Sequence, residues 1–121
     1  MPQRRRISLT ASSEFERVYR KGSVYRGRLF SVHALPNHVG KARLGLSVSK
    51  RVGTAVTRNG VRRRLKEIFR SSMEDLPSGV DLVISARPAA AEASFDELSE
   101  EFISSVDRLS KSGEARSGGG S

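Results

Sequence analysis

One stretch of the chain combines an apolar helix face with dense positive charge, and the fold has to serve both. Residues 47–70 hold eight lysines or arginines against a single acid, Glu67. From Thr57 onward, the helical period of about 100° per residue gathers apolar side chains on one side and cations on the other. The apolar side consists of Val61, Leu65, Ile68 and Phe69. This side requires a protein core, so we expect the basic side to lie at the surface.

The predicted start of this helix lacks the acids that a helix dipole favours. Thr57 is an acceptable N-cap, but Arg58 and residues 62–64 occupy the first two turns without a carboxylate. Backbone amides, the dipole and the guanidinium groups all favour an anion such as phosphate there. With Lys50 and Arg51 just before the helix, the pattern indicates a nucleic-acid surface, and a solvated basic helix face is the alternative. The predicted binding residues, called the basic surface below, are Lys50, Arg51, Arg58, Asn59, Arg62, Arg63, Lys66 and Arg70.

The charge of the chain is divided unevenly along its length. Residues 1–40 carry eight cations and two acids, residues 41–70 carry ten and one, and residues 71–121 carry four and ten. The cations therefore concentrate around the basic surface, and the acids keep the remaining part of the chain soluble.

The composition limits the class of protein. A length of 121 residues suits one domain with a single core. The chain has no cysteine, which excludes disulfides, thiol nucleophiles and thiolate metal sites and fits a reducing compartment. No apolar run approaches the roughly 18–20 residues that span a bilayer, and the arginine-rich start lacks the apolar region of a secretory signal. We expect a soluble, cytoplasmic protein without a membrane partner.

The first half of the chain predicts a helix followed by strands. Ser13 and Glu16 have capping-box spacing, which predicts a helix over residues 13–20. Residues 23–35 form a run typical of β structure, with a bend or bulge at Gly27. Residues 43–49 alternate between apolar and polar side chains, and we predict that they pair back on this run as an antiparallel hairpin.

The second half predicts the basic helix, one buried strand and a last helix. Residues 80–86 are almost continuously apolar, which predicts a strand inside a sheet. Ser94 and Glu97 form a second predicted capping box before the last helix. The order helix, strand, strand, strand, helix, strand, helix indicates an α+β fold, a two-layer α/β sandwich. We predict a flexible basic arm at residues 1–8, one domain at 9–111, and a disordered Gly/Ser tail at 112–121.

Residues 43–70, RLGLSVSKRVGTAVTRNGVRRRLKEIFR, resemble the signature block of the bacterial ribonuclease P protein subunit. The resemblance implies a sandwich similar to one domain of a small-subunit ribosomal protein, with a left-handed crossover around the basic helix. Crossovers are right-handed in about 98% of cases, so physics alone predicts the opposite hand. The motif of this family that touches the catalytic RNA corresponds to Arg58, Asn59 and Gly60. Glycine replaces the third arginine and costs roughly 1 kcal/mol of helix stability, and Arg62 and Arg63 are expected to cover part of the lost contact.

The resemblance also implies a cleft that holds the 5′ leader of precursor tRNA. The corresponding residues are Phe15, Tyr19, Phe30 and His33. Stacking on an aromatic face is worth roughly 1–3 kcal/mol per base with little sequence preference, which suits a variable leader. For Phe15 and Phe30, the alternative is packing in the core. A catalytic or metal-binding role of His33 is disfavoured, because no cysteine or clustered acids lie nearby in the sequence.

The sequence argues against catalysis by the chain itself. Up to Arg70, the only acids are Glu14, Glu16 and Glu67, which form neither a paired-acid site nor a metal-ligand set. We therefore predict no catalytic residue and no metal site on the protein.

The implied function is that of an accessory subunit of ribonuclease P, an endonuclease of tRNA processing. Its partners are the catalytic RNA and precursor tRNA, with Mg²⁺ bound mainly by the RNA and no obligate protein partner. A ribosomal or ribosome-assembly RNA-binding protein without nuclease role is the alternative, because fold does not fix function. A basic helix on a membrane surface is disfavoured, since the core needs its apolar face.

Overall fold

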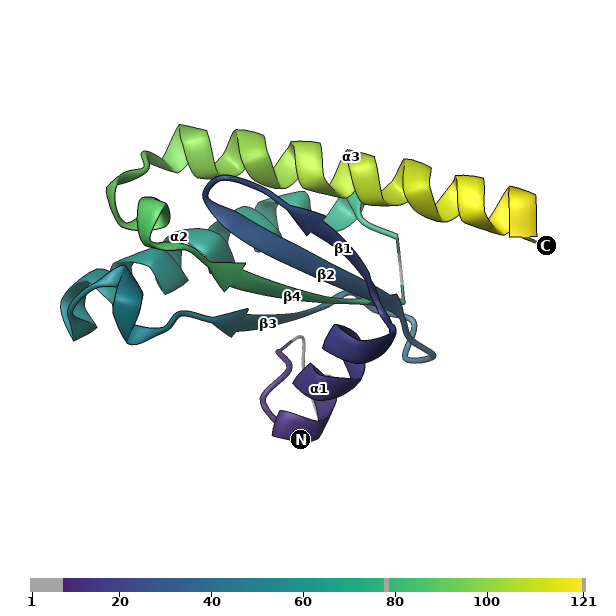
Figure 1. Cartoon of the computed structure of the whole chain (residues 1–121), viewed down its shortest axis with the longest axis horizontal. Helices are drawn as coiled ribbons and strands as arrows, with labels where there is room; N and C mark the ends of the chain where they lie inside the picture. The colour runs from purple at the N-terminus through teal and green to yellow at the C-terminus, as the bar shows by residue number, and fades with distance from the viewer. Residues whose placement is uncertain (1–7, 78, 121) are drawn as a thin grey trace.

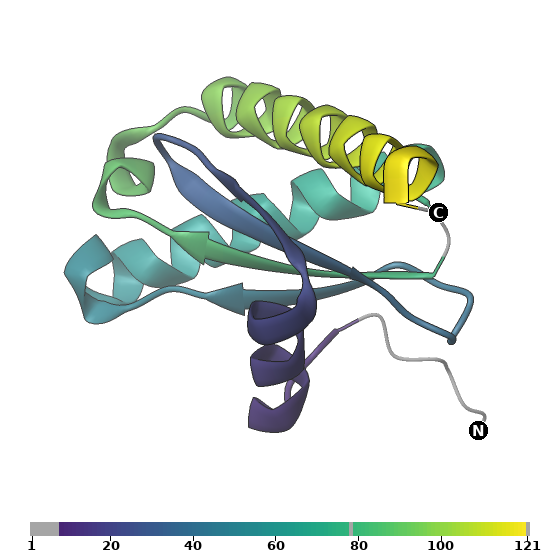
Figure 2. The same ribbon diagram turned by 45° about the vertical axis from the view of Figure 1, so that its right-hand side comes forward.

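The computed structural model describes residues 8–77 and 79–120, with side chains as far as Ser110. Its order of helices and strands confirms the predicted α+β fold. The elements are α1 (Ser12–Lys21), β1 (Ser23–Arg26), β2 (Phe30–Pro36), β3 (Arg43–Ser47), the 3-10 helix η1 (Lys50–Val52), α2 (Ala55–Ser72), η2 (Met73–Asp75), β4 (Val80–Ala86), η3 (Pro88–Glu92) and α3 (Phe95–Gly120). The strands form one sheet with α1 on one face and α2 and α3 on the other (Figures 1 and 2).

The sheet has the strand order β1-β2-β4-β3, so the predicted hairpin between residues 23–35 and 43–49 is wrong. β4 is antiparallel to β2 and parallel to β3, and it separates the two strands that the sequence paired. Residues 80–84 are all buried, which fits a central strand covered on both faces. The hairpin instead forms at the bend near Gly27, where β1 and β2 pair with Arg26 opposite Ser31.

The two faces of the sheet follow the alternation of side chains along each strand. Phe30, Val32 and Ile84 point toward α2 and α3 and are completely buried. The apolar residues predicted for the basic helix complete this core, namely Val61, Leu65, Ile68 and Phe69. Each such side chain contributes about 1.5–3 kcal/mol by leaving water. The opposite face holds a smaller apolar cluster beneath α1, with Val18 and Val83 at its centre.

The helix starts differ from prediction for α1 and α2. α1 begins after Ala11, and the carboxylate of Glu14 accepts hydrogen bonds from the amides of Thr10 and Ala11 at 3.1 Å each. The predicted pair of Ser13 and Glu16 is therefore wrong, because Glu14 reaches the free amides first. α2 is capped by Thr54, whose hydroxyl accepts from the Thr57 amide at 3.3 Å, so the helix starts one turn earlier than predicted.

The predicted cap of α3 is confirmed. The Ser94 amide donates to the Glu97 carboxylate at 2.8 Å, and the Glu97 amide donates to the Ser94 hydroxyl at 3.1 Å. This reciprocal pair satisfies two amides that the helix itself leaves free.

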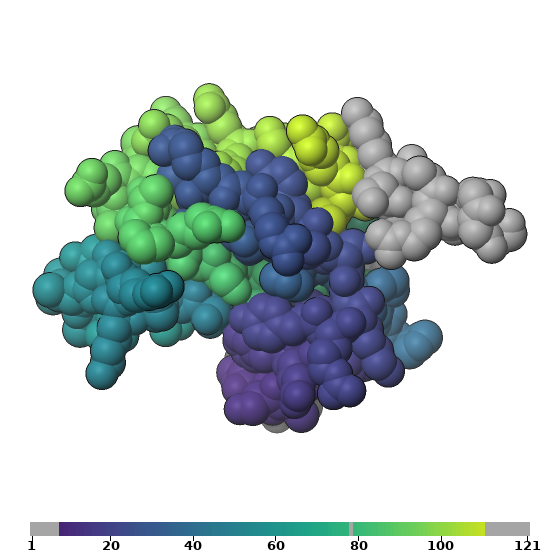
Figure 3. Space-filling view, in the orientation of Figure 1, coloured from purple at the N-terminus to yellow at the C-terminus, as the bar shows by residue number. Residues whose placement is uncertain are grey.

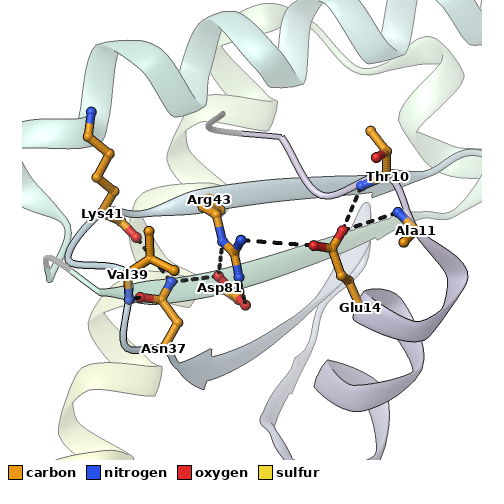
Figure 4. A network of polar contacts seen from close by, with 8 residues as sticks. All are labelled: Thr10, Ala11, Glu14, Asn37, Val39, Lys41, Arg43 and Asp81. Atoms are coloured by element: carbon orange, nitrogen blue, oxygen red, sulfur yellow. Dashed lines mark hydrogen bonds and ion pairs between the residues drawn. The ribbon is translucent and has the colours of Figure 1, made fainter. Parts of the chain in front are cut away.

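A buried ion pair joins α1, β3 and β4 (Figure 4). Asp81 is 1% exposed and accepts two hydrogen bonds from the Arg43 guanidinium, both at 2.9 Å. Asn37 donates to the same carboxylate at 2.6 Å, and Glu14 lies 3.9 Å from Arg43. The hydrogen bonds to Asp81 raise the pKa of Arg43 above its ordinary value. The pair therefore fixes the start of α1 against the edge of the sheet.

The β3–α2–β4 connection joins two parallel strands, and its left hand stays a prediction. Of the predicted basic arm, residues 1–7 lie outside the described residues, and Ser8 bridges to Leu44. The predicted tail falls where only the backbone of α3 is described, up to Gly120. The division of the chain at both ends therefore stays a prediction.

Candidate nucleic-acid interface

Gly53 shapes the turn between η1 and the start of α2. Its φ is 152°, and a Cβ at this position would lie 3.0 Å from Thr57 Cγ2. The Gly53 carbonyl accepts a hydrogen bond from Arg58 Nε at 3.2 Å. The turn therefore sets the direction in which Arg58 leaves the first turn of the helix, where no acid is present.

The structure gathers the predicted basic surface along η1 and one side of α2. Most of its residues are exposed, and Arg58 and Arg62 are half-buried. Within the described part of the chain, none of its cations forms an ion pair. The surface therefore carries charge that the described protein leaves uncompensated, which favours a polyanion as its ligand.

Arg64 was counted among the cations at the helix start but was left out of the predicted binding residues. Its side chain is half-buried, and Nη2 lies 3.7 Å from the point where a Cβ of Gly60 would be. Helical side chains lean toward the N-terminus, so a residue covers the turn before it. The buried Nη1 has no hydrogen-bond partner among the described residues. The spacing of Gly60 and Arg64 could have indicated this position, because a glycine four residues before an arginine in a helix leaves room for the arginine's guanidinium group.

Three of the four predicted leader-cleft residues meet between α1 and the sheet. Phe15 lies on β3 at Gly45, where a Cβ would come within 2.7 Å of the ring. Tyr19 is 39% exposed and contacts His33 of β2 edge-on, with ring centroids 4.9 Å apart. The Phe15 and Tyr19 rings are 6.4 Å apart. The prediction of an aromatic group at this place thus has a geometric basis in Phe15, Tyr19 and His33.

Phe30 is in the wrong place for the predicted cleft. It is completely buried on the face of the sheet that α2 and α3 cover. His33 is three residues away on the same strand, and an odd separation puts two side chains on opposite faces. Packing in the core, the alternative for this residue, is what the structure shows.

The surroundings of His33 favour its neutral form. Burial lowers the pKa of His33 below the usual value, and the positive charge of Arg26 lowers it further. Its ring atom Nδ1 is buried and has no hydrogen-bond partner among the described residues. The histidine therefore offers an uncharged polar group rather than a cation beside Tyr19.

A row of polar side chains lies next to these aromatic residues, and it was not predicted from the sequence. Register places Arg26 opposite Ser31, Ser31 opposite Ser85, and Ser85 opposite Ser47. Tyr19 Oη lies 3.1 Å from Ser85 Oγ. Figure 3 shows an indentation of the surface between α1 and the lobe formed by η1 and the start of α2. We call the part of this sheet face that lies next to α1 the α1 groove, and contacts and strand register place Tyr19, Ser31, His33, Ser47 and Ser85 on it.

The described residues also bear on the other readings of the sequence. Among them, no three His, Asp or Glu side chains gather in a way that could hold a metal ion. No helix in the same part of the chain is long and apolar enough to cross a membrane. The apolar side of α2 is occupied by the core, which counts against its use on a membrane surface.

Known proteins similar to this chain agree with the geometry. The family model described as Ribonuclease P matches residues 1–110. A ribonuclease P protein component from Clostridium botulinum is 39% identical over 93 residues, covering 76% of this chain and 84% of that protein. Another from Kocuria rhizophila is 39% identical over 106 residues, covering 88% and 92%. The solved ribonuclease P protein of Thermotoga maritima superposes with a TM-score of 0.78 at 26% identity, covering 88% and 98%.

These likenesses extend over nearly all of the chain rather than the basic helix alone. They support the ribonuclease P reading and give no support to a ribosomal one. The chain therefore belongs to the ribonuclease P protein family.

Proposed function

We propose that the chain binds the catalytic RNA of ribonuclease P through its basic surface and assists removal of the 5′ leader from precursor tRNA. The observation that carries this proposal is the set of cations along η1 and α2 without an ion pair in the described protein. RNA phosphates would supply the missing negative charge, and the released counterions would drive binding. Membership of the family supports the choice of RNA partner.

The α1 groove is the proposed site of the 5′ leader. The ring of Tyr19 is partly exposed and is contacted edge-on by His33. An exposed ring held in one orientation suits stacking of an unpaired base. Phe15 supports this wall of the groove by packing on β3. Phe30 has no part in the proposal, because it is buried on the other face.

The hydrolysis is assigned to the RNA partner. The described side chains do not form a carboxylate or histidine cluster that fits Mg²⁺, so the proposal gives the metal mainly to the RNA. Mg²⁺ supplies charge stabilisation and an activated water in such reactions. The protein neutralises phosphates and orients the leader, which leads to a mature tRNA 5′ end.

Reconstitution tests the proposed role as a whole. Adding the chain to a bacterial ribonuclease P RNA at low Mg²⁺ should restore cleavage of precursor tRNA, because the cations substitute for part of the missing metal charge. The chain without RNA should leave the same substrate intact. Robust metal-dependent cleavage by the protein alone would overturn the assignment.

A double substitution tests the groove. Tyr19→Ala with His33→Ala should weaken holoenzyme binding of precursor tRNA by about tenfold and leave mature tRNA unchanged, since only the precursor has a leader to stack. Equilibrium binding with cleavage blocked measures both affinities. His38→Ala, in the exposed loop after β2, is the control variant. Equal losses for precursor and mature tRNA would refute leader stacking.

A further inference from the structure

The floor of the α1 groove is a row of hydroxyl groups that crosses the sheet. Ser31, Ser85 and Ser47 are register partners on three neighbouring strands, and Arg26 continues the row onto β1. All three serines are half-buried. Neighbouring strands lie about 4.8 Å apart, so the three serines span roughly 10 Å from β2 to β3. We call Ser31, Ser47 and Ser85 the hydroxyl row.

Most of the hydrogen-bonding capacity of the row is unused. Within the described residues, Ser31 and Ser47 have no side-chain hydrogen bond, and Ser85 has only the one with Tyr19. The unpaired Nδ1 of His33 lies on the same face of the sheet, because His33 is two residues from Ser31 along β2. Burial of a polar atom without a partner is costly, so Nδ1 favours a ligand that supplies one.

The kind of group on the floor distinguishes among the parts of a nucleotide. A phosphate oxygen only accepts hydrogen bonds and is best served by a cation such as Arg26, which stands opposite Ser31 on β1. A serine hydroxyl and a neutral imidazole each combine a donor with an acceptor. The ribose 2′-hydroxyl has the same double character, and DNA lacks it.

We infer that the hydroxyl row, together with His33, binds ribose 2′-hydroxyls of a single-stranded segment, so that the α1 groove selects RNA over DNA. Stacking on Tyr19 holds a base of any identity, while the row reads the sugar. This inference rests on the proposed binding of the leader in the same groove.

The test compares three ligands on the reconstituted holoenzyme with cleavage blocked. They are mature tRNA, precursor tRNA with an RNA leader, and the same precursor with a 2′-deoxy leader. The wild-type protein should bind the RNA leader about tenfold more tightly than the deoxy leader, as expected for two or three lost hydrogen bonds. Equal affinity for the two leaders would overturn the inference.

Substitutions then assign the preference to the row. The triple variant Ser31→Ala, Ser47→Ala, Ser85→Ala should lose most of the preference for the RNA leader, because only His33 remains to contact the 2′-hydroxyls. Ser85→Thr keeps a hydroxyl and should keep the preference, and Ser104→Ala, exposed on α3 across the sheet, is the matched control. An undiminished RNA preference in a triple variant that still binds the catalytic RNA would overturn the inference.

Binding of mature tRNA, the third ligand, distinguishes failure of the proposed leader site from failure of the sugar recognition. If precursor and mature tRNA bind wild-type holoenzyme equally, the proposed leader site itself fails. If the precursor binds more tightly but the sugar has no effect, the leader site stands and only the sugar readout fails.

Discussion

Gly53 holds the start of the basic surface in a backbone conformation that other residues avoid. Gly53→Ala should destabilise the fold by about 1–3 kcal/mol, because the alanine is strained at a φ of 152° and its Cβ meets Thr57. Urea-induced unfolding measures the change. Gly60→Ala is the matched control: its Cβ contacts only Arg64, and a helical alanine should stabilise by about 1 kcal/mol. Similar effects of both substitutions would contradict the role given to Gly53.

At the same scale, the burial of residues was predicted correctly where the helical period determines it. It was predicted less well where a residue had to be assigned to one face of a strand. The amphipathic pattern of α2 correctly separated Val61 and Leu65 from the exposed cations. Phe30 was placed by resemblance, although its separation of three residues from His33 already favours opposite faces of a strand. The hydroxyl row could not be predicted, because it depends on the register of strands far apart in the sequence.

At the scale of elements, the bounds of β4 and the cap of α3 agree with the sequence, and strand pairing does not. Apolar composition indicates a central strand but does not predict which strands pair with it. β2 and β3 are consecutive in the chain, which favours a hairpin, yet β4 lies between them. The free energy gained by burying β4 on both faces outweighs the preference of consecutive strands to pair through a short connection. That free energy is gained only when the whole sheet has assembled.

α2 is the element whose charge is expected to set affinity for the catalytic RNA. Arg63→Ala with Lys66→Ala should weaken binding of that RNA and reduce the salt dependence, with the slope of log K against log salt falling by about 0.7–0.9 per lost phosphate contact. Titrations at several salt concentrations measure both. Arg108→Ala, which removes one positive charge from the exposed side of α3, is the control away from the basic surface. An unchanged slope would show that these two cations do not touch phosphates.

At the scale of the whole molecule, Asp81 connects β4 to β3 and to the turn after β2. Asp81→Ala should destabilise the fold by about 3–5 kcal/mol, because it leaves the Arg43 guanidinium without its buried partner. Chemical unfolding provides the measurement. Glu16→Ala breaks an exposed pair with Arg20 and should cost less than about 1 kcal/mol, which makes it the control. A comparable loss in the two variants would argue against the structural weight given to Asp81.

The central position of β4 also determines when the molecule can become complete. During synthesis the chain emerges from its N-terminal end, so β2, β3 and the cationic helix exist before the strand that joins them. Until residue 86 has left the ribosome, the two earlier strands have no common neighbour and the cationic helix has no complete sheet to pack on. A truncated or stalled product would therefore present loose positive charge to every RNA nearby, and selective recognition begins only with the last third of the polypeptide.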